Sequence, residues 1–476
     1  MTKKALHGII KQLQRFRCET QTISVKAAHT CCPTRLYDSI SSFSNQDGGG
    51  IIVFGIDESK KFDVVGVYDS EDLMQQVLEQ CQQMEPAVVP LFTVCTIDKK
   101  IVVSAEIPSA DVACRPVYYK GAGKIKGSFV RVGEANEPMN AYEIYRYDAY
   151  HRRLRDDIRV TNASVSQMDV EKIERYISAV KASKPDLSQL SDNDILELTG
   201  IMRDSIPTLA GIICFAKYPQ HIFPQLCITA VVVPDTDLGQ NDSMGHRFTA
   251  NERIEGTLEQ MLEKAVLFVK KHMDIWTIVD NDGKPKEHYE YPLMAIREAI
   301  LNALMHRDYS IHTEGSPVRI IMYSNRIEII SSGGLYGTLT IDRLGTKLTD
   351  IRNQTLANIL EILNVAENRC SGITTIRMVM REACLPPPRF AHKRDTFVIT
   401  LENNIGNSIA KSRDINAAIL KFCMVPRNRD EIVAFIGLSP YYSTRTFITP
   451  LVQEGKLRLS IPDKPRSRFQ KYMTVV

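Results

Sequence analysis

Apolar residues recur at two different spacings in the first third of this 476-residue chain. Leu36, Ile40 and Phe43 follow the helical spacing, whereas the β-branched run at residues 51–57 is typical of a buried strand. Three more stretches have the composition of strands: residues 94–97, 101–107 and 128–132. Residues 1–157 are therefore predicted to form a domain of mixed α and β structure.

The same reasoning divides the rest of the chain into three further regions. A helix near residues 170–180 and a strand at 226–233 predict a connecting α/β module over residues 158–245. Residues 246–402 contain an apolar helix around Glu298, followed by strands and a glycine loop, so a second α/β domain is predicted there. A polar linker precedes the last region, residues 413–476. The predicted fold class is α+β with several domains.

The last region has the pattern of a winged helix-turn-helix. Its first helical face is formed by apolar residues, namely Ile415, Ala418, Ile419 and Phe422. Asn428 is placed to cap a second helix over residues 430–436. A third helix is predicted over residues 442–454, where Pro450 should kink or shorten it, and a hairpin begins at Gly455.

Composition indicates a protein of the reducing cytoplasm. The net charge is only +3 and 24% of residues are charged, which is ordinary for a globular chain. Eleven cysteines occur without a C-x-x-C motif, so neither a disulfide framework nor a zinc ribbon is indicated. Basic residues interrupt the amino-terminal apolar stretch, and the apolar runs elsewhere are short. A cytoplasmic location without a signal peptide or a membrane partner is therefore expected.

Local charge in the carboxy-terminal region indicates a DNA partner. Six cations face a single acid, Asp463, in this stretch: Lys456, Arg458, Lys464, Arg466, Arg468 and Lys471. Arg445, at the start of the third predicted helix, is expected to read bases in the major groove. A winged helix that contacts protein instead of DNA is the alternative.

Glu298 and Asn302 are the candidate catalytic pair. They are four residues apart, so on a helix they project from one face. A carboxylate and a carboxamide on one face can orient a water and hold a hydrated Mg²⁺, which triphosphate hydrolysis requires. The alternative is an ordinary amphipathic helix with a polar side.

The unit from Tyr291 to Tyr309, with Glu298, Asn302 and the His306-Arg-Asp sequence, resembles the GHKL-type ATP-binding domain of bacterial proteins related to the carboxy-terminal region of the RecG helicase. The resemblance implies an α/β sandwich over residues 246–402, with Glu298 activating water and Asn302 binding Mg²⁺. It also assigns ATP-binding roles to other residues: His306, Arg307, Asp308, Gly333, Gly334, Arg352, Asn353 and Gly372. Arg307 and Asp308 could instead pair with each other.

Several positions depart from that family's pattern. Ser331 or Ser332 stands where better-known members carry an aspartate that reads adenine, Gln354 replaces a proline, and Cys370 replaces a lid glycine. At most slow ATP hydrolysis is therefore expected. A scaffold with a degenerate nucleotide pocket is an alternative.

The segments 19–26, 43–57 and 130–133 resemble the AlbA-like domain that is shared with Schlafen proteins. Schlafen nucleases hold a metal with two glutamates and an aspartate; Glu19 and Asp57 match two of these, but Ser24 occupies the second glutamate position. The resemblance therefore implies a vestigial metal site and makes a metal-dependent nuclease the less favoured function.

A nucleic-acid surface is still expected in this domain, with Lys26 and Arg131 as contacts and RNA as a possible partner. The aromatic residues Tyr118, Tyr119 and Phe129 alternate with lysines across a predicted hairpin, which suits base stacking beside phosphate contacts. The alternative is a solvated edge strand that its lysines protect from pairing.

The order of these regions resembles bacterial transcriptional regulators that carry an ATP-binding domain. The resemblance implies a cytoplasmic, homo-oligomeric DNA-binding regulator that responds to nucleotide. ATP and Mg²⁺ are the expected cofactors. The nuclease and the scaffold remain the alternatives.

Overall fold

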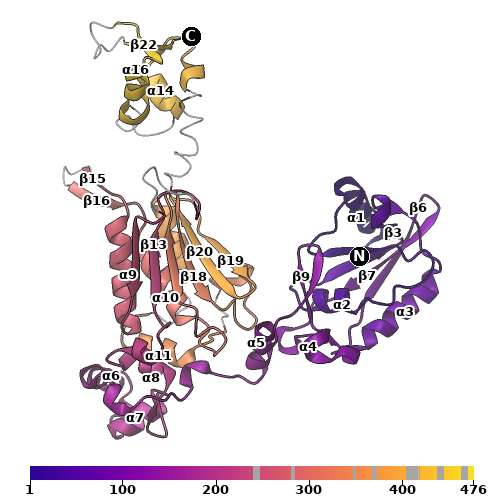
Figure 1. Cartoon of the computed structure of the whole chain (residues 1–476), viewed down its shortest axis with the longest axis horizontal. Coiled ribbons are helices and arrows are strands. Elements are labelled where there is room, and N and C mark those ends of the chain that lie inside the picture. Colours follow the sequence, from indigo (N-terminus) through magenta and orange to yellow (C-terminus); the bar gives the residue numbers. More distant parts are fainter. Residues whose placement is uncertain are drawn as a thin grey trace.

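The computed structural model describes most of the chain: residues 1–239, 247–279, 285–346, 350–366, 372–403, 416, 419–436, 444–461 and 470–475. It confirms a mixed α+β chain with several domains (Figure 1). None of the helices in these ranges is long and apolar enough to cross a membrane.

The amino-terminal domain is built on a four-stranded sheet in the order β1-β2-β7-β6, in which β1 and β2 are parallel and the other pairs antiparallel. Its strands are β1 (Ile23–Lys26), β2 (Gly50–Phe54), β6 (Leu91–Ile97) and β7 (Lys100–Ile107). The helix α1 (Lys3–Phe16) covers one face, and α2 (Tyr37–Ser44) and α3 (Ser70–Gln82) cover the other. In β2, Val53 packs on the α1 side, whereas Ile52 and Phe54 pack on the α2 side, as the two-residue period of a strand requires.

Short elements complete this domain: β3 (Ile56–Asp57), η1 (Glu58–Lys60), β4 (Asp63–Val64), β5 (Met84–Glu85), η2 (Val112–Cys114), β8 (Tyr118–Tyr119), η3 (Lys120–Ala122), α4 (Gly123–Gly127), β9 (Phe129–Val132) and β10 (Ala135–Pro138). The predicted aromatic hairpin is reduced to a single antiparallel bridge between Tyr118 and Ser128, because β8 pairs with β5 and the helix α4 lies between β8 and β9 in the chain. Tyr119 stacks on Tyr37 with ring centres 4.6 Å apart, and Phe129 is buried. These aromatic rings serve the core and do not form a stacking platform.

The helix α5 (Ala141–His151) connects this domain to the rest of the chain (Figure 1). It begins at a capping box in which the Asn140 side chain accepts a hydrogen bond from the Glu143 backbone and the Glu143 side chain accepts one from the Asn140 backbone. The short helix η4 (Asp156–Ile158) follows it.

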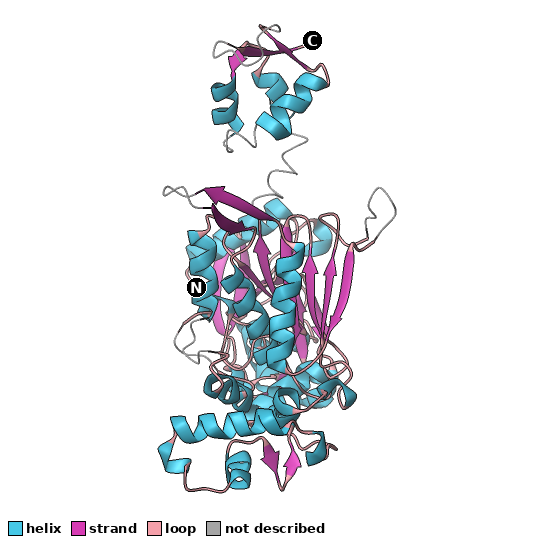
Figure 2. Cartoon of the chain, turned by 90° about the vertical axis from the view of Figure 1, so that its left-hand side faces the viewer, coloured by secondary structure: helices cyan, strands magenta, loops and turns pink. Residues whose placement is uncertain are grey.

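The central domain contains a six-stranded sheet in the order β14-β13-β17-β18-β20-β19. Its strands are β13 (Ile228–Val232), β14 (Ala250–Ile254), β17 (Val318–Met322), β18 (Arg326–Ser332), β19 (Arg389–Lys393) and β20 (Thr396–Glu402). Three helices pack beside one another over the sheet (Figures 1 and 2): α9 (Leu258–His272), α10 (Leu293–Met305) and α12 (Gly372–Glu382). The remaining helices are α6 (Val170–Ser183), α7 (Asp192–Leu198), α8 (Leu209–Phe215), α11 (Gln354–Ile362), η5 (Val165–Gln167), η6 (Pro185–Leu187), η7 (Pro219–His221) and η8 (Ile341–Arg343). The short strand pairs are β11 (Met202–Arg203) with β12 (Ile206–Pro207), and β15 (Ile275–Val279) with β16 (Pro285–Tyr289).

The predicted boundary at residue 245 does not separate two packing units. The strand β13, which was predicted to belong to a connecting module, lies inside the six-stranded sheet and pairs in parallel with β17. One hydrophobic core extends from Ala163 to Leu401. Residues 158–402 therefore pack as a single domain within the described ranges.

The carboxy-terminal region contains α14 (Arg429–Ile436), η9 (Thr444–Ile448), α16 (Thr449–Gln453) and a sheet of β21 (Arg427–Asn428), β23 (Lys471–Thr474) and β22 (Leu457–Leu459). The Asn428 cap is confirmed: its Oδ1 accepts a hydrogen bond of 2.8 Å from the backbone of Glu431. The predicted third helix is divided into a π-helical turn and a short α-helix whose first turn contains Pro450. Lys464, Arg466, Arg468 and the Arg445 side chain lie outside the described parts.

Candidate nucleotide-binding site

The helix α10 brings Glu298 and Asn302 to the wall of a cavity of about 140 Å³. Its opposite side is apolar and buried, including Ala295, Ile296 and Ala299, so the polar residues at the helical spacing face outward. Seven of the predicted site residues line this cavity: Glu298, Asn302, His306, Gly333, Gly334, Arg352 and Gly372.

The Asn302 amide has a fixed orientation in this cavity. Its Nδ2 donates a hydrogen bond of 2.7 Å to the Glu298 carbonyl, so Oδ1 is the atom left to accept a ligand. A Cβ atom on Gly372 would lie 2.9 Å from both Glu298 Oε2 and Asn302 Nδ2. Glycine at this position therefore lets the start of α12 approach the pair closely.

The loop after β18 depends on its two glycines. Gly333 has a φ of +89°, and a side chain there would collide with Nη1 of Arg352. A side chain on Gly334 would collide with the ring of His392. Because both positions are glycine, Arg352 reaches the loop and its Nη2 donates a hydrogen bond of 2.9 Å to the Gly334 carbonyl.

His306 contributes a neutral ring to the cavity. The side chain lines the cavity. Desolvation by the protein, and then the positive charge of Arg352, lower the pKa of His306 to about 4. At neutral pH the imidazole is therefore uncharged and can accept a hydrogen bond as well as donate one.

Two predicted ATP-binding residues have structural roles instead. Arg307 is 2% exposed, donates to the Thr313 carbonyl, and has its pKa lowered by burial. Asn353 is fully buried, and its Nδ2 donates to the carbonyls of Met305 and Arg307, which ties the end of α10 to the start of α11. Neither lines the cavity, so these two predictions are wrong.

Asp308 lies on the other side of Arg352, at 3.4 Å, and does not line the small cavity. This contact corrects both the predicted phosphate-facing position and the alternative pairing with Arg307. Burial alone would raise the pKa of Asp308, but Arg352 and hydrogen bonds from Tyr142 and Ser310 hold it below its usual value. The carboxylate is therefore a stable partner for Arg352.

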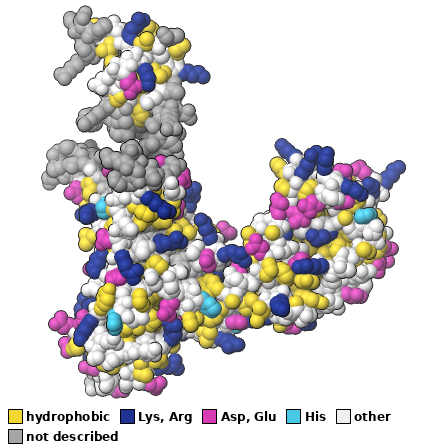
Figure 3. Space-filling view, viewed as in Figure 1, with side chains coloured by type: hydrophobic (Ala, Val, Ile, Leu, Met, Phe, Trp, Pro, Cys, Tyr) yellow, Lys and Arg dark blue, Asp and Glu magenta, His cyan; other side chains and the backbone are white. Residues whose placement is uncertain are grey.

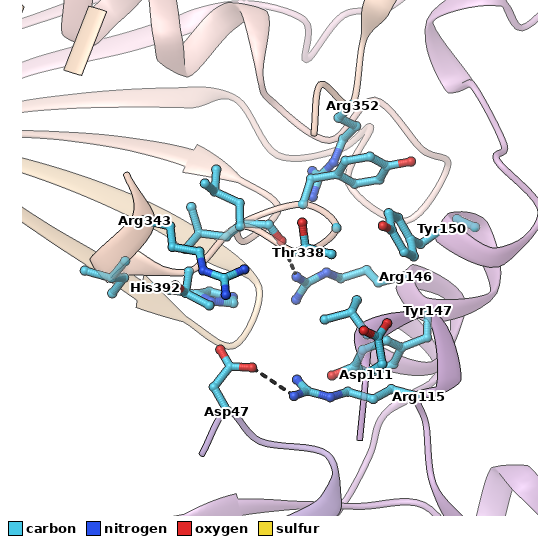
Figure 4. A pocket seen from close by; sticks show the side chains of 18 of the residues that line it. Asp47, Asp111, Arg115, Arg146, Tyr147, Tyr150, Thr338, Arg343, Arg352 and His392 are labelled. Atoms are coloured by element: carbon cyan, nitrogen blue, oxygen red, sulfur yellow. Dashed lines mark hydrogen bonds and ion pairs between the residues drawn. The ribbon is translucent and has the colours of Figure 1, made fainter. Parts of the chain in front are cut away.

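A second cavity, of about 710 Å³, lies between the amino-terminal and central domains (Figure 4). It is lined by Asp47 and Arg115 from the amino-terminal domain, by Arg146 from α5, and by Arg343 and His392 from the central domain. Four residues line both cavities and form the wall between them: Leu335, Tyr336, Leu339 and Arg352.

One face of α5 is hydrogen-bonded to Leu335 in that wall and to two aspartates beside it, contacts that were not predicted from the sequence. The Tyr142 hydroxyl donates to Asp308 Oδ2 at 2.6 Å, Arg146 Nη2 donates to the Leu335 carbonyl at 2.9 Å, and Tyr150 donates to Asp350 at 3.3 Å. The signal was available in the sequence, because polar residues at 142, 146 and 150 follow the helical spacing after a capping box.

The predicted vestigial metal site is closed by protein contacts. Glu19 accepts hydrogen bonds of 3.0 Å from Ser24 and 2.7 Å from the Val25 backbone, and its second oxygen pairs with Arg131 at 2.8 Å. Arg131 is 4% exposed, so the prediction that it contacts nucleic acid is wrong. Lys26 hydrogen-bonds to the Ser24 hydroxyl at 3.4 Å.

Asp57 accepts hydrogen bonds from Ser59 and caps η1. Its pKa is lowered, first by the Ser59 side chain. Within the described ranges, no three histidine, cysteine or acidic residues come together as a metal site. In the described structure Glu19 and Asp57 are therefore engaged in local contacts of the domain.

Comparison with known families identifies two segments of the chain. Residues 19–140 match the family model "Schlafen, AlbA_2", and residues 315–401 match "Putative ATP-dependent DNA helicase recG C-terminal". The chain combines a Schlafen AlbA_2 domain with a RecG-related, ATPase-like domain. Residues 146–229 match a domain of unknown function, and no curated protein matches the chain.

Two solved structures are similar to parts or most of the chain. The DIP2311 protein from Corynebacterium diphtheriae is 16% identical, with 96% of this chain and 92% of that chain covered and a TM-score of 0.41. The amino-terminal domain of a RecG-related protein from Nitrosomonas europaea is 22% identical, with 28% of this chain and 92% of that chain covered and a TM-score of 0.23.

Proposed function

We propose that this protein is a nucleotide-responsive DNA-binding protein that acts as a transcriptional regulator. The observation that carries the proposal is the placement of Glu298 and Asn302 side by side in a cavity that is also lined by Leu335 and Asp350, two residues hydrogen-bonded to the linker helix α5. A ligand in that cavity would contact residues that connect directly to the AlbA_2 domain. Homo-oligomeric assembly and a cytoplasmic location remain predictions from the sequence.

The residues in the ATPase-like domain fit ATP with Mg²⁺. Asn302 Oδ1 is oriented to coordinate a cation. Mg²⁺ is commonly bound by one or two protein oxygens, with phosphates and water as its other ligands. The metal would neutralise phosphate charge, and Glu298 would orient the attacking water. Arg352 lines the cavity, but its Nη1 lies 3.4 Å from Asp308, so a phosphate would have to share the guanidinium with that carboxylate.

Nucleotide binding in this proposal requires the wall between the two cavities to move. A cavity of about 140 Å³ is smaller than the roughly 300–1,000 Å³ of typical ligand pockets, whereas the neighbouring cavity of about 710 Å³ falls within that range. Displacement of Tyr336 and Arg352 would join the two spaces. Because α5 is hydrogen-bonded to Leu335 in this wall, the displacement would change the position of α5 and of the AlbA_2 domain that it connects.

The DNA-binding part of the proposal rests on the carboxy-terminal region. Arg458 in β22 and Lys471 in β23 are exposed cations, and Lys456 precedes them at the end of a helix, where it pairs with Glu454 at 2.8 Å. The described helices α14 and α16, the helical residues 419–422 and the three-stranded sheet are compatible with a winged helix-turn-helix. We therefore propose that β22 and β23 form the wing that contacts phosphates.

Removing the α5 contacts should uncouple DNA binding from nucleotide. ATP with Mg²⁺ is expected to change the affinity of the wild-type chain for duplex DNA at least fivefold, which corresponds to a coupling of about 1 kcal/mol. The double variant Tyr142→Phe, Arg146→Ala should reduce that effect below twofold and leave ATP affinity within about threefold. Fluorescence anisotropy of a labelled duplex with and without nucleotide measures both effects.

A matched control is Tyr218→Phe with Arg203→Ala, which removes the same chemical groups from exposed positions elsewhere in the central domain. It should behave as wild type. If the α5 variant retains the full nucleotide effect, the linker helix does not transmit the signal.

A further inference from the structure

The exposed face of α1 is strongly cationic. Residues 2–17 contain five lysines and arginines and no acidic residue. Lys4, Lys11 and Arg15 fall within a narrow stripe at the helical spacing, directly opposite the buried residues of the helix. At a rise of about 1.5 Å per residue, this row is roughly 16 Å long.

These cations are not used to hold the fold together. No ion pair is formed by Lys4, Lys11 or Arg15 in the described structure; Arg15 only lies over the Phe16 ring, at 5.4 Å. Figure 3 shows Lys and Arg side chains gathered at the end of the AlbA_2 domain where α1 lies in Figure 1. The row is therefore open to a polyanionic partner.

The helix α1 also breaks two rules of helix stability without a structural reason. Gly8 lies in its middle, next to the cationic row, and a Cβ atom there would meet nothing within 4 Å. A mid-helix glycine costs about 1 kcal/mol relative to alanine, so packing does not account for it. Lys3 and Lys4 occupy the first turn, where the helix dipole favours acids. Such local conflicts are expected at functional surfaces.

We propose that this face of α1 is a nucleic-acid-binding surface that contacts the sugar–phosphate backbone of duplex DNA. Lys4, Lys11 and Arg15 neutralise phosphates. Because Gly8 has no side chain, the sugar–phosphate backbone of the DNA can approach the helix closely between Lys4 and Lys11. A membrane is the less suitable partner, because Leu6, Ile10 and Leu13 are buried and Phe16, at the end of the helix, is the one large apolar side chain of α1 that is largely exposed in the described structure. This inference rests on the proposed DNA-binding role but is independent of the nucleotide site and of the wing.

The test uses the full chain and a labelled 30-base-pair duplex at a series of salt concentrations. The triple variant K4Q, K11Q, R15Q should reduce the magnitude of the log-affinity versus log-salt slope by about two to three, because each phosphate contact contributes about 0.9. A control with the same change in charge is K184Q, R203Q, K271Q, at exposed cations of the central domain that form no salt bridge within the described ranges. It should leave the slope within about 0.5 of wild type.

Gly8→Ala separates function from folding. It should slow hydrogen exchange of the α1 amides, because alanine favours the helix, and yet weaken duplex binding at least fivefold. Slower hydrogen exchange of the α1 amides with unchanged duplex affinity would contradict the claim that the DNA backbone approaches the helix closely at Gly8. A triple variant that behaves like its charge-matched control would overturn the whole proposal.

Two further arms identify the partner and separate this proposal from the wing. Vesicles containing phosphatidylserine should not bind through α1; loss of vesicle binding by the triple variant with an unchanged DNA slope would assign the surface to a membrane and contradict the proposal. The wing variant R458Q, K471Q should lower the slope by about one to two on its own. If the wing variant leaves the slope unchanged while the triple variant reduces it, the proposal that β22 and β23 contact DNA is rejected and the proposal for α1 stands.

Discussion

Replacing Arg131 by alanine is expected to lower the free energy of unfolding of the AlbA_2 domain by about 3–5 kcal/mol. The guanidinium and the Glu19 carboxylate have side chains only 1% and 9% exposed, and they pair at 2.8 Å. Arg131 also donates to Asn136 and to the carbonyls of Thr20 and Ile23. Its removal would leave a buried carboxylate without its partner cation, which costs far more than a surface pair.

Denaturant unfolding followed by hydrogen exchange of β1 and β9 measures this loss. The exposed Lys126, in the helix next to β9, provides the control, and Lys126→Ala should change stability by less than about 0.5 kcal/mol. Replacing both charges, as Arg131→Met with Glu19→Leu, should recover part of the loss. Arg131→Ala with wild-type stability but weakened DNA affinity would restore the nucleic-acid role that the buried contacts exclude.

The second large effect is expected at the nucleotide site. Asn302→Ala should raise the dissociation constant for ATP with Mg²⁺ at least tenfold, because it removes the amide oxygen that faces the cavity. Glu298→Gln should keep nucleotide binding and lower any hydrolysis rate by about 100-fold, the usual contribution of a general base. Calorimetry and phosphate release measure the two effects separately.

Met294→Ala is the control for both, since Met294 lies on the same helix and is 51% exposed. It should leave binding and hydrolysis unchanged. If Glu298→Gln hydrolyses ATP at the wild-type rate, then Glu298 does not orient the water, and the activity belongs to other residues.

The sequence was sufficient wherever the decisive contacts are local. The helical spacing of Glu298 and Asn302 was enough to place both on one face, and the Asn428 cap involves residues only three apart. Family resemblance added Gly372, whose closeness to the pair depends on α12 packing against α10, a contact between distant segments.

The sequence misled where charged residues are buried. Arg131 resembles a surface cation in the sequence, but its partner Glu19 lies more than a hundred residues away in the chain. Arg307 donates to the nearby Thr313 carbonyl, and it is the packing around it that buries it. The place of β13 also depends on a distant segment, because its partner strand β17 lies about ninety residues later in the chain. The contacts of α5 with Asp308 and Leu335 join residues well over a hundred positions apart, so a domain boundary drawn from composition could not reveal them.

The central claim is that the cavity beside Glu298 and Asn302 binds a nucleotide with Mg²⁺. Isothermal titration calorimetry of the full chain with ATP, with and without Mg²⁺, tests it most directly. The structure predicts measurable heat with ATP that depends on Mg²⁺ and is lost in Asn302→Ala. No heat from the wild-type chain at millimolar ATP with Mg²⁺ would contradict the claim and leave a scaffold with a degenerate pocket.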